Sequence, residues 1–417
     1  MPGSAVITGG DYLLELSTGF DSSAFYLNDS LLDGPDVLDG DGTDFIDITP
    51  VVQNISIQRG RHKPLDVFGP GTMSVSISVP NTNREYDPLN TASAYYNDFT
   101  EQPGLAPLRA IRLSRNGAYL FTGRVTTYNQ QYTMAGLTNY QIFAADDIYV
   151  LSQGSLPETA TSSQTSSARI TAVLTAATYT GTTSLTATPT ATLGAFTITS
   201  GTNVNAYINR IQQAEQGRIF CDRENVLTAQ ERIGTTLAAP TATFNDTGTA
   251  TPYDNIVVEF DQQTVINNAN VTIESGGVLQ NASNASSISE YFTQTEAITD
   301  SLLSTNAQAA TLASYLLNPL PEPRFTSVST TFASLTDAQK TALAPIEIGD
   351  TVSATKSFAS GSPLAVQQNL AVEGIDHVID VNTGHRMTLW TSPTVIVYAF
   401  VLDDPTFGLL DGLNVLG

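Results

Sequence analysis

The chain has 417 residues, of which 41% are hydrophobic and 14% are charged, and its formal net charge at pH 7 is −23. The length allows roughly two to three domains, each with its own core. The excess of carboxylates argues against binding to nucleic-acid phosphates, and the single cysteine, Cys221, excludes an intrachain disulfide and a cysteine-rich metal site.

The N-terminus lacks the basic and apolar segments of a signal peptide, and no apolar run approaches the ~20 residues that a membrane span needs. We therefore expect neither a signal peptide nor a membrane span. Residues 1–50 are rich in Asp and Gly and are expected to form an acidic N-terminal arm.

Residues 51–152 carry the pattern of β strands. Val75, Ile77 and Val79 alternate with serines, which is typical of a strand with one buried face. Asn116 and Gly117 lie between two strand-like segments and predict a tight hairpin, because both residues accept positive φ. These segments predict a meander that closes into a first small β barrel.

Residues 153–248 predict a mixed α/β insertion beside that barrel. A short helix is expected over residues 168–176. A second helix is indicated by apolar residues at helical spacing, with Asn203 as its N-cap and Gly217 as its stop. Residues 218–232 then predict a hairpin, with Cys221 in a buried core position.

Residues 249–395 predict a second β-barrel domain with helices, followed by an extended C-terminal tail over residues 396–417. A helix is expected over about residues 306–317, and Ser334 to Asp337 resemble a capping box that opens another short helix. The expected strands cover residues 255–260, 268–275, 324–332, 346–354, 370–380 and 385–391. The predicted fold class is thus mainly β, with two small barrels, an α+β insertion and extended termini.

The two β regions contain a weak internal sequence repeat. In each, a strand that begins with glycine (Gly123 and Gly374) is followed by a turn and an alternating strand. Chance similarity of two meanders and duplication of one barrel explain this equally well.

Catalytic groups are scarce in this sequence. It has three histidines and no HExxH, GxSxG, phosphate-loop or GxGxxG pattern. His377 and His385 could face each other across a hairpin and orient a zinc ion or a proton, although ordinary strand positions are the favoured interpretation. We expect no enzymatic activity, no catalytic residue, no cofactor and no metal.

A cationic run, Arg59 to Lys63, stands out in so acidic a chain. It is too short, and too poor in neighbouring aromatic residues, to indicate a nucleic-acid site. A solvated loop is one interpretation. The favoured one is contact with an acidic protein surface, including another copy of this chain, because charge complementarity fixes the register between subunits.

Several motifs occur in an order that resembles minor tail proteins of long-tailed (siphovirus-type) bacteriophages, in particular those that infect actinobacteria. They are SIQRGR, GTMSVSISVPNTNREYDP, LFTGRV and AADD, followed by GRIFCDRENVL, IEIGDTV and LDDPTFGLLDG. The resemblance covers most of residues 51–417. The matching positions in its first part are Arg59, Gly60, Arg61, Gly71, Thr72, Tyr86, Asp87, Pro88, Phe121, Thr122, Gly123 and Arg124.

The resemblance implies a virion structural protein, a tail-tip (baseplate) hub that closes or adapts the tail tube and forms part of the DNA-ejection channel. It implies two barrels per chain, so that three chains match a six-fold tube. The implied partners are other copies of the chain (a trimer, or alternatively a hexamer), a distal tail or tube protein, a tape measure protein, and fibre or spike proteins. DNA would pass through the lumen without specific binding.

Two other functions stay open, a hexameric distal tail ring protein and a tail protein that binds host-surface carbohydrate. The implied location is the tail tip of a virion made in the host cytoplasm. The candidate subunit-interface residues are Arg59, Arg61, Lys63 and Arg124.

Overall fold

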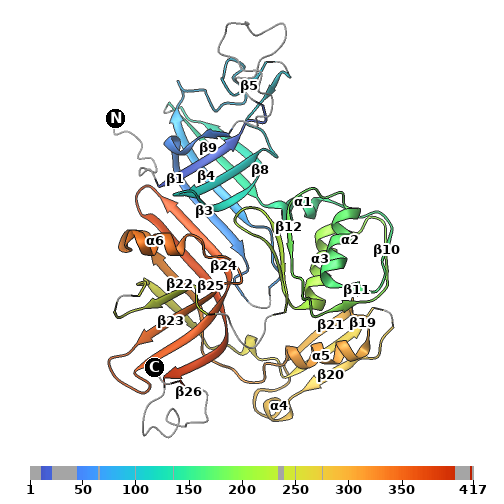
Figure 1. The fold of residues 1–417 in the computed structure, drawn as a ribbon. Helices are drawn as coiled ribbons and strands as arrows, with labels where there is room; N and C mark the ends of the chain where they lie inside the picture. Colours follow the sequence, from blue (N-terminus) through green and yellow to red (C-terminus); the bar gives the residue numbers. More distant parts are fainter. Residues whose placement is uncertain are drawn as a thin grey trace.

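The computed structural model describes residues 11–20, 45–63, 66–98, 100–134, 136–232, 239–248, 250–274, 276–399 and 414–415. This part of the chain is mainly β, as the sequence predicts, and includes six α helices. A 14-stranded sheet runs through two of its three regions in the order β18-β22-β25-β24-β3-β4-β9-β8-β7-β1-β2, with β17, β23 and β26 attached at its side. Figure 1 shows this sheet at the top and lower left, and the third region at the right.

The first β region forms the upper part of the sheet (Figure 1). Its strands are β1 (Tyr12–Ser17), β2 (Phe45–Asp47), β3 (Val52–Gly60), β4 (Thr72–Pro80), β5 (Tyr96–Asn97), β6 (Gln102–Pro103), β7 (Ala110–Arg115), β8 (Ala118–Tyr132) and β9 (Leu137–Ala145). A 3-10 turn, Thr49–Val51, precedes β3. The buried face of β4 carries Val75, Ile77 and Val79, as predicted.

The hairpin predicted at Asn116 and Gly117 is confirmed and joins β7 to β8. Both residues have positive φ, 48° and 81°, which gives the turn the twist of its strands. Tyr12–Ser17, within the range expected to be an arm, forms β1 and pairs with β7. The Asp-rich residues 21–44 of that expected arm lie outside the described residues.

The second β region forms the lower left of Figure 1. Its strands are β17 (Ala242–Asn245), β18 (Asn255–Glu259), β22 (Arg324–Thr331), β23 (Thr351–Ser357), β24 (Ala365–Asp380), β25 (Gly384–Ala399) and β26 (Asn414–Val415). A 3-10 turn, Phe332–Ser334, leads to helix α6 (Asp337–Leu343). The capping box of α6 is Thr336 with Gln339, two residues later than the sequence suggested, because these side chains reach the free backbone amides.

Two separate barrels were expected, and the described strands correct this. No barrel closes among them; instead, both regions share one sheet, because β24 pairs with β23 through its first half and with β3 through its second half. Gly374 lies opposite Gly60 in this ladder. The backbones approach so closely there that a Cβ on Gly60 would lie 2.3 Å from the carbonyl oxygen of Glu373.

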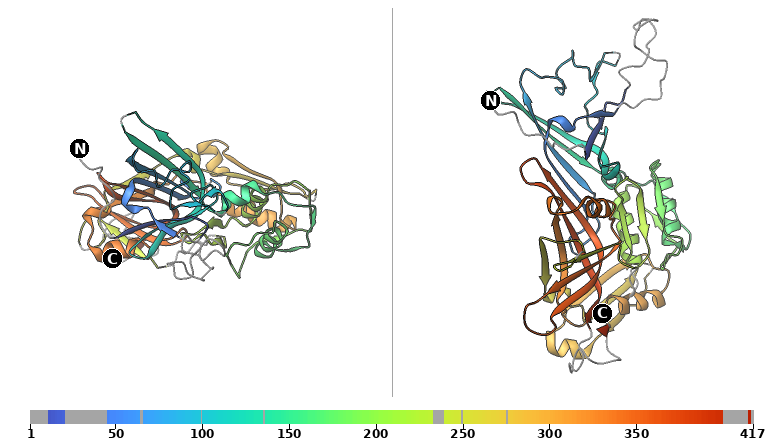
Figure 2. Two further views of the ribbon diagram at one scale, coloured as in Figure 1. Left: turned by 90° about the horizontal axis from the view of Figure 1, so that it is seen from above. Right: turned by 60° about the vertical axis from the view of Figure 1, so that its left-hand side comes forward.

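The middle region packs four helices, α1 (Asp147–Gln153), α2 (Ser166–Ala176), α3 (Val204–Glu215) and α5 (Asn306–Leu316), and several short strands around its own core (Figure 2). Helices α2, α3 and α5 confirm the predicted ones, and Asn203 caps α3 as expected. The left-handed cap of α3 is Gln216, one residue before the predicted Gly217. Helices α1 and α4 (Ala285–Tyr291) were not predicted.

The strands of the middle region are short. They are β10 (Thr159–Ala160), β11 (Gln164–Thr165), β12 (Thr183–Leu185), β13 (Thr192–Leu193), β14 (Thr197–Ile198), β15 (Arg218–Cys221), β16 (Leu227–Gln230), β19 (Asn268–Ile273), β20 (Gln280–Ser283) and β21 (Thr295–Ser301). The predicted hairpin is β15–β16, and Cys221 is buried as expected. The core of this region also includes side chains from residues 266–317, which the sequence-based boundaries assigned to the second β region. A 3-10 turn, Gln262–Thr264, leads into that segment.

The internal sequence repeat corresponds to two hairpins, β8–β9 and β24–β25, which flank the hairpin β3–β4 on opposite sides. Gly123 and Gly374 also share a steric constraint. A Cβ on Gly123 would lie 2.5 Å from the carbonyl oxygen of Ala145, and one on Gly374 would lie 2.6 Å from that of Arg61. Close packing against a neighbouring carbonyl oxygen therefore explains why both positions are glycine. This explanation holds whether the two hairpins arose by duplication or are similar by chance.

Within the described ranges, no helix combines the length and the apolar character that crossing a membrane requires.

Candidate functional site

The cationic run lies where the three regions meet. Arg59, near the end of β3, has a side chain that is 3% exposed and binds Glu347 with two contacts, Nη1–Oε2 at 3.0 Å and Nη2–Oε1 at 2.9 Å. Glu347 also accepts the backbone N–H of Arg223 at 3.0 Å. Arg59 thus ties the first β region to the segment that precedes β23.

Glu373 on β24 is the centre of this junction. Its carboxylate accepts Nε and Nη2 of Arg61 at 2.9 and 2.8 Å, Nη2 of Arg218 at 2.7 Å, and the hydroxyl of Ser392 at 2.7 Å. Its side chain is 1% exposed. Burial by itself would raise the pKa of Glu373, but the charges of Arg218 and Arg61 outweigh burial and lower it.

These contacts come from all three regions. Arg61 follows β3, Arg218 lies on β15 of the middle region, and Glu373 and Ser392 belong to the second β region. Opening such a buried ion pair leaves an uncompensated charge, which costs about 3–5 kcal/mol. We call Glu373, Arg61, Arg218 and Ser392 the Glu373 junction.

The other predicted interface residues lie nearer the surface. Lys63 is exposed. The Arg124 side chain is 47% exposed, and its Nε lies 3.4 Å from Oδ1 of Asp147. The structure therefore places two of the four predicted residues, Arg59 and Arg61, inside the protein and two at its surface; as subunit-interface residues, all four stay predictions.

Sequence reasoning found the arginines and missed their partners. Glu373 stands between Val372 and Gly374 in the otherwise apolar segment Leu370–Ile375. A carboxylate inside a buried strand must be paired, because burying an isolated charge is very costly. An isolated glutamate in an apolar strand was therefore the sequence signal for a buried partner of the arginines.

His62 and Trp390 stack at the rim of the same junction. Their ring centroids are 4.2 Å apart with an interplanar angle of 19°. Trp390 Nε1 donates to Oδ2 of Asp376 at 2.8 Å, and Nε2 of His62 lies 3.4 Å from Oδ1. The one tryptophan of the chain is thereby engaged in intrachain contacts.

His377 and His385 do meet across the β24–β25 hairpin. Nδ1 of His377 lies 2.9 Å from Nε2 of His385, whose Nδ1 lies 2.8 Å from the hydroxyl of Tyr12 on β1. Burial lowers the pKa of His377 to about 3, and burial together with His377 lowers that of His385 well below its usual value. Both rings are thus neutral near pH 7. The described residues contain no group of three or more His, Cys, Asp or Glu placed to hold a metal.

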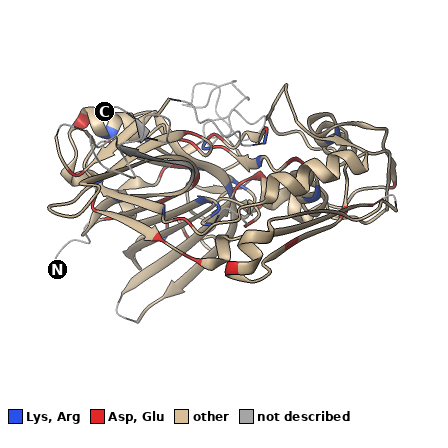
Figure 3. Ribbon diagram, turned by 90° about the horizontal axis from the view of Figure 1, so that it is seen from below, with Lys and Arg blue, Asp and Glu red and all other residues tan. Residues whose placement is uncertain are grey.

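Most cations outside this junction are also neutralised within the chain. The further ion pairs among described residues are Arg84–Asp87, Arg112–Glu15, Arg115–Asp11, Arg210–Glu274, Arg324–Glu322, Lys340–Asp337 and Lys356–Asp246. Figure 3 shows how few basic residues the ribbon carries. Because the net charge is −23, the protein presents an excess of negative charge to its surroundings. Exposed carboxylates include Asp98, Glu101, Glu158, Glu259, Glu290 and Asp300.

Neither a family model nor a curated protein matches the sequence. Solved structures do match the fold. The 43 kDa tail protein of prophage MuSo2 from Shewanella oneidensis is 11% identical, with a TM-score of 0.60 over 92% of this chain and 98% of that chain. A tail protein from Neisseria meningitidis MC58 is also 11% identical, with a TM-score of 0.58 over 84% of this chain and 93% of that one.

The prophage tail protein gp18 from Listeria monocytogenes EGD-e is 10% identical, with a TM-score of 0.50 over 92% of this chain and 95% of that one. At such low identity the likeness establishes the fold. The similarity to phage and prophage tail proteins extends over nearly the whole length of both partners, so it includes all three regions and their arrangement.

Proposed function

We propose that this chain is a structural protein of a bacteriophage tail and that it acts by assembly, without catalysis. The observation that carries the proposal is the full-length likeness of its three-region fold to tail proteins. The order of the motifs in residues 51–417 supports the same assignment independently of the fold. Since the fold alone does not determine function, the proposal needs a test on virions.

Within the tail, we place the chain at the tip, as a hub that closes or adapts the tube. Two β regions, each with its own core, are held in one sheet by the ladder between β3 and β24. Three copies would therefore present six β regions to a six-fold tube. A hexameric ring protein is the alternative, and for it a single β region per chain would suffice.

The electrostatics suit a channel through which DNA slides. Clustered free cations would bind phosphates and slow the passage, whereas here most cations already pair with carboxylates of the same chain. In this proposal the neighbours are the distal tail or tube protein, the tape measure protein, and fibre or spike proteins. Trp390, held by His62 and Asp376, gives no support to the alternative of carbohydrate binding.

The copy number of the chain in purified virions tests this proposal. Peptide mass spectrometry, calibrated against a capsid protein, should give three copies for the hub. Six copies would instead favour the ring protein. If the chain were missing from virions, the tail assignment would be wrong.

A further inference from the structure

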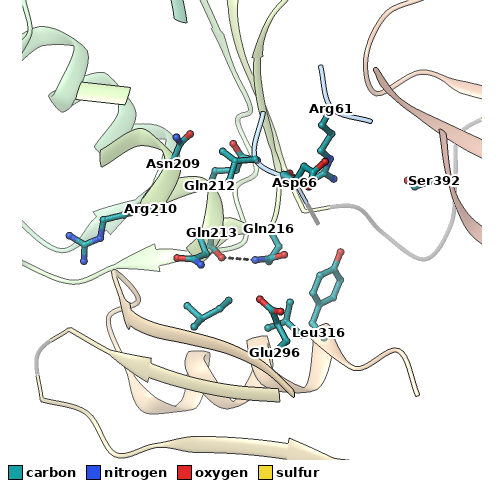
Figure 4. Close-up of a pocket in the computed structure, with 14 residues that line it drawn as sticks. Arg61, Asp66, Asn209, Arg210, Gln212, Gln213, Gln216, Glu296, Leu316 and Ser392 are labelled. Atoms are coloured by element: carbon teal, nitrogen blue, oxygen red, sulfur yellow. Dashed lines mark hydrogen bonds between the residues drawn. The ribbon is translucent and has the colours of Figure 1, made fainter. Parts of the chain in front are cut away.

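A cavity of about 360 Å³ opens where the middle region meets the loop that follows β3. Its walls come from α3, from β21 and α5, and from the cationic run, and Ser392 of the Glu373 junction lies at its far side (Figure 4). Amide side chains of α3 and its C-cap dominate one wall, namely Asn209, Gln212, Gln213 and Gln216.

The two arginines that line this cavity are already paired. Arg61 binds Glu373, and its Nη1 donates to the carbonyl oxygen of Asp66 at 3.0 Å. Arg210 donates through Nη2 to Glu274 and to the carbonyl oxygen of Asp300, both at 2.8 Å. An anionic ligand would have to compete with these partners, so the cavity is a poor anion site.

The carboxylate of Glu296, by contrast, is available. Glu296 on β21 is half-buried, and no described residue forms an ion pair or hydrogen bond with its carboxylate. Burial raises the pKa of this carboxyl, as expected for a charge without a nearby cation.

We propose that this cavity receives a basic side chain, the ammonium of a lysine or the guanidinium of an arginine, from a neighbouring protein. Such a group brings several donors and a positive charge, and so matches the unpaired carboxylate of Glu296. The acidic surface of the chain would steer a basic partner toward it. The identity of the neighbour rests on the proposed assembly function, whereas the chemistry of the cavity does not.

The test uses the full chain with N-acetyl-arginine amide and N-acetyl-lysine amide as probes, followed by NMR of the protein. N-acetyl-citrulline amide is the control, because it keeps the shape of arginine without the charge. We expect the basic probes to bind weakly and to shift resonances of the cavity, and citrulline to bind at least about tenfold more weakly, since it forms no charged pair.

Two variants and one control locate the site. Glu296→Gln should weaken arginine binding about tenfold, and Gln213→Glu, which adds a carboxylate to the exposed part of the wall, should strengthen it. Glu158→Gln, on an exposed residue outside the cavity, makes the same charge change as Glu296→Gln and should leave binding unchanged. Melting temperatures close to that of the parent chain would show that all three fold.

The inference is overturned if citrulline amide binds as well as arginine amide, if Glu158→Gln weakens binding as much as Glu296→Gln, or if neither basic probe binds. If the cavity proposal fails but virions contain the chain, the tail assignment stands. If the chain is absent from virions but binds arginine amide as expected, the cavity proposal stands and the tail assignment is wrong.

Discussion

The junction between the two β regions differs in kind from the junction that attaches the middle region to them. Between β3 and β24 the connection is a backbone ladder, running from Gly60 opposite Gly374 to Asn54 opposite Asp380. The middle region instead attaches through side chains, with Arg218 bound to Glu373 and the backbone N–H of Arg223 bound to the Glu347 carboxylate at 3.0 Å. A ladder depends on main-chain geometry, whereas ion pairs depend on particular charges, so the two junctions should fail under different perturbations.

The largest effect is expected from Glu373→Gln. It leaves Arg61 and Arg218 buried without a carboxylate, so the free energy of unfolding should fall by about 3–5 kcal/mol. Urea denaturation followed by circular dichroism would measure this. Glu274→Gln is the matched control, because its pair with Arg210 is more than a third exposed on both sides and should cost less than about 1 kcal/mol. Equal losses would show that the junction does not hold the regions together.

The backbone ladder is tested by Gly60→Ala. Gly60 has φ of +83°, and a Cβ there would meet the backbone of Glu373, so strain and overpacking together should cost about 2–4 kcal/mol. Gly201→Ala separates the two contributions, because Gly201 has φ of +86° and nothing lies within 4 Å of its added Cβ. Differential scanning calorimetry should give Gly60→Ala the lower melting temperature. The same melting temperature for both variants would mean that the close approach contributes nothing.

Acid should weaken the contact that Tyr12, His377 and His385 form between the two β regions. The pKa of His377 is about 3 in the folded chain and about 6.5 when unfolded. The unfolded state therefore binds the proton first, and stability present above pH 6.5 is lost as the pH falls toward 3. Each such histidine contributes a loss of up to about 1.4 kcal/mol per pH unit.

Asp146 acts in the opposite sense, since burial raises its pKa to about 7. The measurement therefore compares urea unfolding of the parent chain with that of the double variant His377→Gln/His385→Gln at pH 7.5, 6 and 5. Asp146 is present in both proteins, so its contribution cancels in the comparison. The double variant should lose less stability on acidification. Parallel pH profiles would contradict the role assigned to the histidines.

The smallest effect on folding is expected from Lys63→Glu combined with Arg124→Gln, which places no new carboxylate beside Asp147. Lys63 is exposed and Arg124 is half-exposed, so the unfolding free energy should change by less than about 1 kcal/mol. If these residues lie at a subunit interface, assembly measured by analytical ultracentrifugation should be impaired. Normal assembly of this folded variant would remove both from the candidate interface. Charge reversal of Arg59 and Arg61 cannot test the interface, because it would place new carboxylates against Glu347 and Glu373 and disrupt the monomer.

Much of the local structure followed from the sequence alone. The Asn116–Gly117 hairpin, the alternating strand β4 and helix α3 with its Asn203 cap are each encoded by a few neighbouring residues. Turn chemistry, strand periodicity and capping act over short stretches, and so the sequence displays them directly.

Of the candidate site, the sequence revealed the cationic run and left its partners unidentified. Arg61 and Glu373 are 312 positions apart, and nothing near either residue specifies the other. The same holds for the single sheet, because backbone hydrogen bonds between β3 and β24 form with almost any side chains and leave no local pattern. The sequence therefore determined which strands and helices form, whereas only the tertiary structure decided that two expected barrels share one sheet, and that two conspicuous arginines bind carboxylates inside the chain.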